Sequence, residues 1–494
     1  MPRFPGKPLA CAALAIVSLA APAAALDDIV ERITDLEQQL ELLKRQLEAQ
    51  IAQAQETATK ANEQASASAV KFKMKGPAPT FESADGQYSM IFTGRIHYDT
   101  ALYDQTPVAT GAQDERFRAD VNSGTNFRRA RIGVEGKIAG DWKYHLMLDA
   151  GGDPDTNAGL YEAYLAYNGL QPLTLTLGRH KAATGFAERV SSNNLAFIER
   201  SLAHTAPSSN FSPPANGFSA KANGEQWNID TGVWYGDSAD DARDEFFYWS
   251  GRAAYAPINT KDITIHLGAH ASYMFEPEQD TRTSTIFATR PEMRVSDNLW
   301  IAAASQTRFA NDAAWAYGLE GAAKYQNFWL NGEVNLFGMD QLRDPAGGGL
   351  DGPDGNFSSY YIQAGWILTG ETKSYKMSKA AWAGVKPKNP FSLSGGGWGA
   401  LELAIRYSVA DLNDEENTFQ IDSVGNSEFA GFRGGKEENI TIGLNWYVNN
   451  NIRFMFNYIH ADIDRLTVGQ SAGQGGLQRG DTFDIYALRA QVKW

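Results

Sequence analysis

The sequence has a single cysteine, few histidines and, beyond its first 25 residues, no long apolar run. The cysteine is Cys11, which excludes an internal disulfide framework and a cysteine-ligated metal site. A membrane-spanning helix needs about 18 consecutive apolar residues, so none is expected in the rest of the chain. The formal net charge of −14 argues against nucleic acid as a partner. Glycine (47 of 494 residues) and aromatic residues (12%) are both more abundant than a helical enzyme would need.

Residues 1–25 have the pattern of a secretory signal peptide. Arg3 and Lys7 precede an apolar run that starts at Leu9, and three alanines at 23–25 end it. We expect cleavage after these alanines and export of the mature chain. An N-terminal membrane anchor is the alternative, but the run is short for a bilayer and ends in Ala and Pro.

Residues 27–69 are predicted to form a helix, and the segment 26–70 a periplasmic coiled coil. Apolar residues recur at alternating steps of four and three, which is the a/d seam of a heptad repeat. Polar residues cover the other faces, which favours self-association over packing against the chain's own domain. Residues 71–87 contain Pro77 and Pro79 and are expected to be a linker. The seam consists of Ile29, Ile33, Leu36, Leu40, Leu43 and Leu47.

From Tyr88 onward, apolar and polar residues alternate with the period of a β-strand. In the last strand, Leu488 and Val492 share one face while Arg489 and Lys493 share the other. Each such run is about long enough to cross a bilayer as a tilted strand. We predict sixteen strands, at 88–103, 126–138, 142–150, 158–168, 172–179, 217–223, 226–236, 246–256, 263–275, 314–325, 328–338, 357–371, 398–411, 437–448, 451–463 and 481–494.

Short turns follow most even-numbered strands and longer loops follow most odd-numbered ones, as in bacterial outer-membrane barrels. One long connection, 372–397, falls on the short-turn side. A soluble β-sandwich or β-helix is the alternative, but strands in those folds are usually shorter. The predicted fold is therefore an all-β, 16-stranded antiparallel transmembrane β-barrel over residues 88–494, preceded by the N-terminal α-helical coiled coil.

A barrel of sixteen strands is wide enough to leave an aqueous channel, so diffusion is the expected function. Charges at the narrowest point then set selectivity. The loop 180–216 carries apolar side chains such as Phe186 and Phe197, so it should pack inside the barrel and narrow it. Arginine binds phosphate oxygens in a bidentate manner and lysine acts as a point charge. The candidate anion-binding and pore-lining residues are Arg95, Arg129, Arg131, Lys137, Arg179, Lys181, Arg189, Arg200, Arg290 and Arg294.

Local ion pairs are the alternative role for two of the loop arginines. Arg189 follows Glu188 directly, and Arg200 follows Glu199 directly. Either pair could neutralise the cation and remove it from permeation.

Five stretches of the barrel region read "FTGRIHYD", "FRRARIGVEGKIAGDWKYHLMLD", "LYEAYLAYNGLQPLTLTLGRHKAATGFAERVSSNNLAFIERSLA", "AGWILTGETKSYK" and "GLNWYVNNNIRFMFNYIHAD". In their order and separation they resemble the phosphate-selective porin O and P family, from about Tyr88 to Trp494. The resemblance implies an outer-membrane homotrimer of sixteen-stranded barrels, each with an anion-selective pore for phosphate or polyphosphate.

The resemblance also assigns segments within the pore. Arg179 and Lys181 match the start of the family's constricting loop, and Arg129 and Arg131 match its basic second strand. The segment 372–397 resembles one that reaches back into the barrel from the periplasm, which would account for its length. The coiled coil also fits a trimer, with its helices in the periplasm.

Three alternative functions remain open from the sequence. A general or weakly selective porin for other small solutes would differ only in which charges reach the constriction. A coiled-coil envelope tether, contacting the cell wall or another periplasmic component, would make the pore incidental. An enzyme built on the barrel would need a nucleophile, base and orienting group that the sequence does not offer, since His266 and His270 share a face without an acidic partner at clear spacing. No catalytic residue, metal or cofactor is predicted.

Overall fold

The computed structural model divides the chain into two units, residues 1–69 and 70–494. The first 22 residues, which hold most of the predicted signal peptide, lie outside the described part of the chain. The described residues are 23–68, 70–105, 121–152, 158–211, 214–235, 247–276, 286–296, 301–304, 311–341, 354–415, 419–421, 427–429, 431–464 and 480–494.

The first unit contains one long helix, α1 (Ala23–Ser68), in agreement with the helix predicted at 27–69. All six side chains of the predicted seam are exposed, from Ile33 at 50% to Leu36 and Leu43 at 62%. An exposed apolar seam with a heptad period needs a partner to cover it. Self-association of α1 stays a prediction, because a single chain is described. Among the described residues, no helix has both the length and the apolar character needed to cross a membrane.

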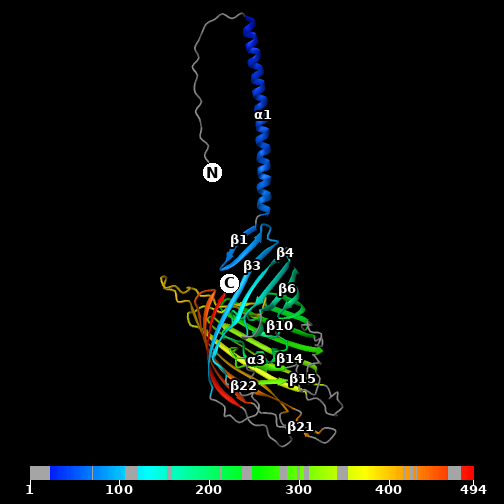
Figure 1. Ribbon diagram of the computed structural model, residues 1–494, viewed down its shortest axis with the longest axis vertical. Coiled ribbons are helices and arrows are strands. Elements are labelled where there is room, and N and C mark those ends of the chain that lie inside the picture. Colours follow the sequence, from blue (N-terminus) through cyan, green and yellow to red (C-terminus); the bar gives the residue numbers. More distant parts are fainter. Residues whose placement is uncertain are drawn as a thin grey trace. The chain divides into compact units, whose positions relative to one another are not determined.

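The second unit is a closed antiparallel barrel of sixteen strands, which confirms the predicted barrel (Figure 1). Each strand pairs with the next one along the barrel, and the last pairs with the first through Lys493 opposite Arg95. The strands are β3 (Ser89–Gln105), β4 (Gly124–Ile138), β5 (Trp142–Asp149), β6 (Gly159–Leu170), β7 (Leu173–His180), β8 (Ala215–Asn223), β9 (Trp227–Tyr235), β10 (Phe247–Asn259), β11 (Ile263–Glu276), β14 (Asn311–Tyr325), β15 (Phe328–Gln341), β16 (Gly355–Ile367), β19 (Ala400–Asp414), β22 (Phe432–Tyr447), β23 (Ile452–Asp464) and β24 (Asp481–Lys493).

The closing strand is fixed at its end by the backbone of β3. Trp494 and Gly94 exchange two backbone hydrogen bonds, of 3.1 and 3.2 Å. The indole of Trp494 lies over Gly94, where any added Cβ would come within 2.2 Å of the ring. Glycine is therefore required at residue 94 for the final tryptophan to dock.

The segment expected to be a linker, 71–87, is largely a β-hairpin. Its strands are β1 (Val70–Lys75) and β2 (Ala78–Ser83), and β2 pairs in turn with the start of β3. Phe72, Phe81 and Phe92 form a row of aromatic contacts across the three strands. The alternation of apolar residues and lysines in "VKFKMK" favours a strand. Pro77 lies in the turn that follows, and Pro79 lies in β2.

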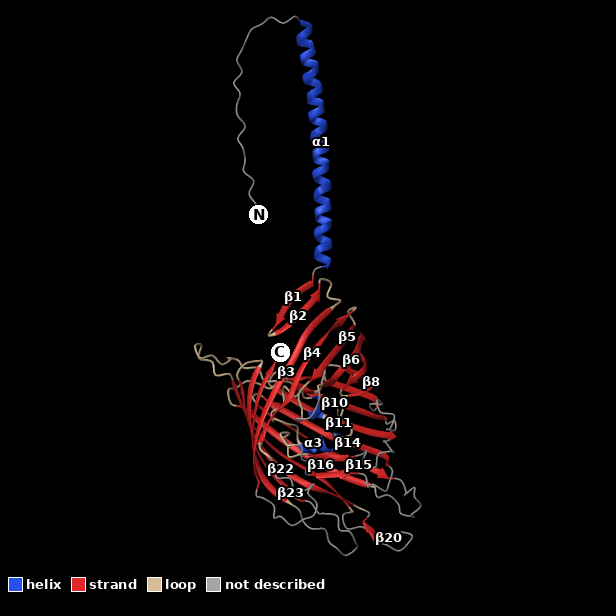
Figure 2. Cartoon of the chain, in the orientation of Figure 1, coloured by secondary structure: helices blue, strands red, loops and turns tan. Residues whose placement is uncertain are grey.

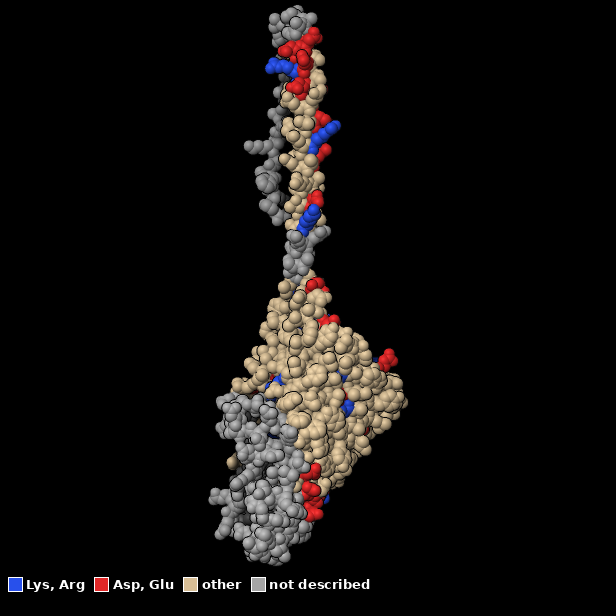
Figure 3. Space-filling view, turned by 90° about the vertical axis from the view of Figure 1, so that its right-hand side faces the viewer, with Lys and Arg blue, Asp and Glu red and all other residues tan. Residues whose placement is uncertain are grey.

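Polarity in the barrel is the reverse of that in a soluble protein. Outward side chains such as Leu177 (64%), Leu319 (69%) and Leu488 (55%) are apolar and exposed. Inward side chains such as Arg406 and Glu402 are polar and buried. One outer face carries few charged residues along much of its height (Figure 3). An apolar outer band around a polar interior is the pattern of a transmembrane barrel.

Several segments between strands fold into the barrel interior, and Figure 2 shows α3 (Leu202–Ser208) of one of them within the ring of strands. The first, 181–211, contains α2 (Phe186–Arg189) and α3. The second holds the hairpin β12 (Ile286–Thr289) with β13 (Ile301–Ala304), which contacts β19, β22 and α3. The third holds β17 (Tyr375–Lys376), which pairs with β18 (Ala381–Trp382). A separate strand pair, β20 (Phe419–Ile421) with β21 (Ser427–Phe429), follows β19 in the chain. Buried apolar residues including Phe186, Ile198 and Phe287 hold the interior segments in place.

Two ends of the barrel can be told apart by their connections. The "turn end" carries the short connections 139–141, 171–172, 224–226, 260–262 and 326–327, together with the start of β3. The "loop end" carries the connections that follow β3, β5, β7, β9 and β11. Segment 372–397 enters from the turn end, as its position after β16 requires.

Candidate functional site

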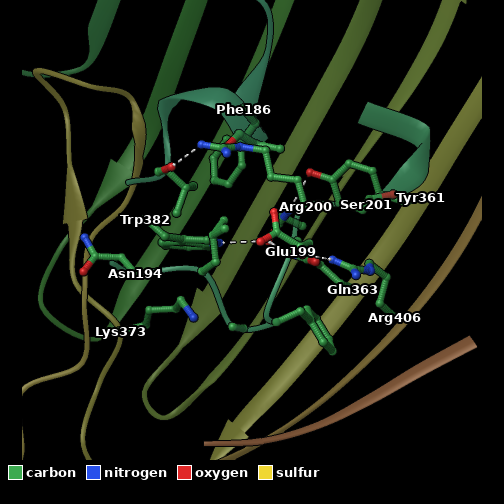
Figure 4. Close-up of a pocket in the computed structure, with 16 residues that line it drawn as sticks. Phe186, Asn194, Glu199, Arg200, Ser201, Tyr361, Gln363, Lys373, Trp382 and Arg406 are labelled. Atoms are coloured by element: carbon green, nitrogen blue, oxygen red, sulfur yellow. Dashed lines mark hydrogen bonds between the residues drawn. The ribbon is translucent and has the colours of Figure 1, made fainter. Parts of the chain in front are cut away.

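Arginines of the barrel wall hold segment 181–211 by its backbone. Arg453 donates to the carbonyl oxygen of Leu195 at 2.7 Å, and Arg406 donates to that of Glu199 at 3.1 Å. Arg489 donates to the carbonyl oxygen of Ile198. The guanidinium fork can satisfy a carbonyl and a carboxylate together, which suits a segment that lacks its own sheet partners. Figure 4 shows Phe186 and Glu199 of this segment around one pocket with Trp382, Tyr361 and Arg406.

Two cavities remain beside the inward segments. The loop-end cavity has a volume of about 640 Å³ and lies between β4–β6, α3 and residues 288–294. The turn-end cavity has a volume of about 790 Å³ and runs along the inner face of β3–β9. Four residues line both cavities: Arg131, Tyr161, Lys181 and Glu188. These four residues, the "junction", mark the place where one cavity meets the other.

The junction places two cations around one aromatic ring. The guanidinium carbon of Arg131 lies 3.4 Å from the ring centroid of Tyr161, and Nζ of Lys181 lies 6.0 Å from it. Arg131 also pairs with Asp149 at 2.6 Å, and Lys181 pairs with Glu188. Contacts on the ring and on the carboxylates fix both cations where the cavities meet.

A bulge explains why Tyr161 reaches the cavities. The pairing of β5 with β6 shifts between Met147 and Leu148, which leaves Tyr161 opposite no single residue. Both Tyr161 and Glu162 consequently line the turn-end cavity, although regular alternation would separate them.

The walls of the cavities carry an excess of positive charge. Among the described residues, thirteen Lys and Arg side chains line the two cavities, against seven Asp and Glu. All seven carboxylates have a basic partner. Glu199 is bound by Arg489 at 2.8 Å and by Arg128 at 3.0 Å, and Asp230 by Arg189 at 2.7 Å. The excess of cations over carboxylates gives the walls a positive field, although the whole chain is acidic.

Two carboxylates of segment 181–211 stay ionised because of these partners. Burial alone would raise the pKa of Glu188, but Arg200 and Lys181 outweigh it and hold the pKa well below its usual range. Burial likewise opposes ionisation of Glu199, and Arg128 and Arg129 hold its pKa well below the usual value. Both groups therefore act as fixed negative charges that orient the arginines around them.

Nine of the ten residues predicted from sequence line the two cavities. The exception is Arg179, which pairs across the sheet with Ala163 and Asn216. It lines neither cavity. The nine are Arg95, Arg129, Arg131, Lys137, Lys181, Arg189, Arg200, Arg290 and Arg294.

The two local ion pairs considered for the loop arginines have other partners. Arg189 pairs with Asp230 on β9, and Arg200 pairs with Glu188 at 3.3 Å. Arg200 also donates to the carbonyl oxygens of Ala187 and Val190. Arg200 therefore ties two turns of the inward segment together.

Four lining residues were missed by the sequence reasoning: Arg128, Tyr161, Lys221 and Lys379. Arg128 faces inward together with Arg129 because β3 and β4 shift register at His97. Lys221 lies on an inward position of a predicted strand, so alternation could have found it. Lys379 belongs to the interior hairpin of segment 372–397, where no strand period applies.

A group of potential metal ligands lies in the wall away from both cavities. Atoms of His270, Glu320 and Glu333 lie within 4.8 Å of one another, which supplies the acidic neighbours that sequence spacing did not reveal. Arg252 binds both oxygens of Glu320, and the backbone amides of Phe186 and Ala187 donate to Glu333. Both carboxylates are engaged by protein donors, so the arrangement fits a buried ion-pair network better than a metal site.

Comparisons with known proteins agree with this architecture. The family model for phosphate-selective porin O and P matches residues 92–494. Porin O of Pseudomonas aeruginosa is 25% identical over 418 residues, covering 80% of this chain and 89% of that protein. An uncharacterized protein of Caulobacter vibrioides is 26% identical over 397 residues, covering 77% and 70%. The solved anion-selective porin from Comamonas acidovorans has a TM-score of 0.50 at 14% identity, covering 82% of this chain and 100% of that one. The chain therefore belongs to the phosphate-selective porin O and P family and is a β-barrel channel protein of the outer membrane.

Proposed function

We propose that the two cavities form the path of small anions through the barrel, with inorganic phosphate or polyphosphate as the natural solute. The observation that carries the proposal is the junction, where Arg131 and Lys181 belong to both cavity walls. An anion passing from the loop end to the turn end would meet these cations at the contact between the cavities. Selectivity would follow from the positive field there.

The donor set suits a tetrahedral oxyanion. Arg128, Arg129 and Arg131 on β4 offer planar forks for two oxygens at once, while Lys181 offers a compact charge. The carboxylates of Asp149 and Glu188 partly neutralise these cations. Partial neutralisation keeps the site from holding the anion too tightly, which conduction requires.

The test is a planar-bilayer measurement on the full mature chain. Across a KCl gradient, the zero-current potential should have the sign of chloride preference, and phosphate added to both sides should reduce the chloride current at low concentration. Chloride preference without phosphate block would favour a weakly selective porin. Cation preference would overturn the anion path itself.

We further propose a homotrimer joined by α1, with the turn end and the helices in the periplasm. The exposed apolar seam of α1 supports this, as does the family to which the barrel belongs. Three seams facing one another would remove these leucines and isoleucines from water. Deletion of residues 27–70 should weaken the trimer and leave conduction in place, whereas loss of envelope attachment alone would favour a tether to the cell wall.

A further inference from the structure

The interior hairpin from the turn end brings one lysine into the anion path. Its strands, β17 and β18, are joined by residues 377–380. Ser378 and Lys379 line the turn-end cavity together with Lys221 and Arg189. The hairpin tip therefore contributes a charge that the barrel strands do not supply.

Lys379 is surrounded by other positively charged side chains. Burial, followed by the fields of Arg189, Lys376 and Lys221, lowers the pKa of Lys379 to about 8. The same repulsion favours movement of the ammonium group, and of the tip that carries it, away from its neighbours. A contact outside the cavity must oppose this repulsion.

Arg252 on β10 makes that contact. Its Nη1 donates to the carbonyl oxygen of Lys379 at 3.1 Å, and its Nη2 donates to that of Ala380 at 2.7 Å. Ala380 has a φ of 45°, a left-handed conformation that alanine rarely adopts without such support. Arg252 itself lines neither of the two cavities.

Glu320 orients the guanidinium for this grip. The Nη2 of Arg252 lies 2.6 Å from Oε1 of Glu320, and both side chains are fully buried. His266 links the same carboxylate, at 3.0 Å, to the hydroxyl of Tyr375 at the base of the hairpin. The buried pair of Arg252 and Glu320 therefore contacts the hairpin at its tip and, through His266, at its base.

We propose that Arg252 is a positioning residue for anion selectivity: by gripping the carbonyls of residues 379 and 380, it holds the Lys379 ammonium group in the anion path. The inference rests on the proposed anion conduction. A purely structural role for the Arg252–Glu320 pair would stabilise the barrel wall without controlling the charge of the pore.

The test compares Arg252→Lys, Lys379→Gln and the double variant in the full mature chain, reconstituted in planar bilayers. The lysine keeps the charge of Arg252 but loses the two-carbonyl fork. The zero-current potential in a KCl gradient is measured at pH of about 7 and about 9, on either side of the pKa of Lys379. Wild type should lose anion preference between these values as Lys379 deprotonates.

Lys379→Gln should lower the chloride-to-potassium permeability ratio about two- to threefold at neutral pH and flatten the pH profile. Arg252→Lys should flatten the profile as well, although Lys379 is present, and the double variant should resemble Lys379→Gln alone. An Arg252→Lys channel that keeps the wild-type pH step would overturn the inference, as would additive losses in the double variant. If that protein fails to form a barrel, Asn228→Ala, which removes the 3.3 Å bond to the carbonyl oxygen of Ser378, tests the same grip. A wild-type channel without anion preference would instead refute the proposed function.

Discussion

Replacing Arg131 by alanine should reduce anion selectivity strongly. Arg131 borders both cavities, lies over Tyr161 and neutralises Asp149. The substitution removes one positive charge from the junction and leaves the carboxylate of Asp149 without this partner. The local field changes in the direction that repels anions.

The size of the effect follows from Coulomb's law. A unit charge about 4 Å from a monovalent anion contributes about 1 kcal/mol in bulk water and about 4 kcal/mol at an effective dielectric constant of about 20. The junction borders two cavities with volumes of about 640 and 790 Å³, so we use the lower value. Since about 1.4 kcal/mol is a tenfold change, we expect the chloride-to-potassium permeability ratio to fall at least about fivefold.

Arg179→Ala is the matched control for this experiment. It removes the same side chain from β7, at a position that lines neither cavity. Zero-current potentials of both variants and wild type would be measured in one KCl gradient. The reasoning is refuted if Arg131→Ala keeps wild-type selectivity, or if Arg179→Ala loses as much.

Three further predictions concern the inward segments and the helix. Phe186→Ala should lower the free energy of unfolding by about 3–5 kcal/mol, because Phe186 is fully buried against His266 and Trp382. It should also raise single-channel conductance as segment 181–211 loosens. Unchanged conductance and unfolding temperature would contradict this. Raising the pH through about 8 should lower anion preference as Lys379 loses its proton, and the fall should be smaller in Lys379→Gln. A peptide of residues 26–69 should self-associate in sedimentation equilibrium, and Leu40→Asp should abolish association while Gln38→Asp, on the opposite face, should not.

The sequence predicts the barrel well because alternation states directly which face of a strand meets lipid. Strand ends are less secure: the strand expected at 437–448 begins at Phe432, since inward contacts extend it beyond the apolar outer band. The inward course of 181–211 also follows from its apolar residues, which could not stay in water.

The details of the candidate site depend on features that a simple period does not encode. A bulge brings Tyr161 to the junction, and a register shift brings Arg128 to the loop-end cavity. Arg179 was expected to line the pore, but strand pairing continues through it to His180 and it lines neither cavity. Lys379 is placed by Arg252, which is 127 residues away in the chain.

The most direct test of the anion path is to change the charge of the junction in an open channel. Lys181→Cys introduces a thiol into a chain whose single natural cysteine, Cys11, lies in the predicted signal peptide. Labelling the full mature chain with a negatively charged methanethiosulfonate during a bilayer recording replaces the cation by an anion. The account predicts a sharp fall in chloride current and a shift of the zero-current potential toward cation preference. Complete labelling with neither change would show that anions do not pass between Arg131 and Lys181.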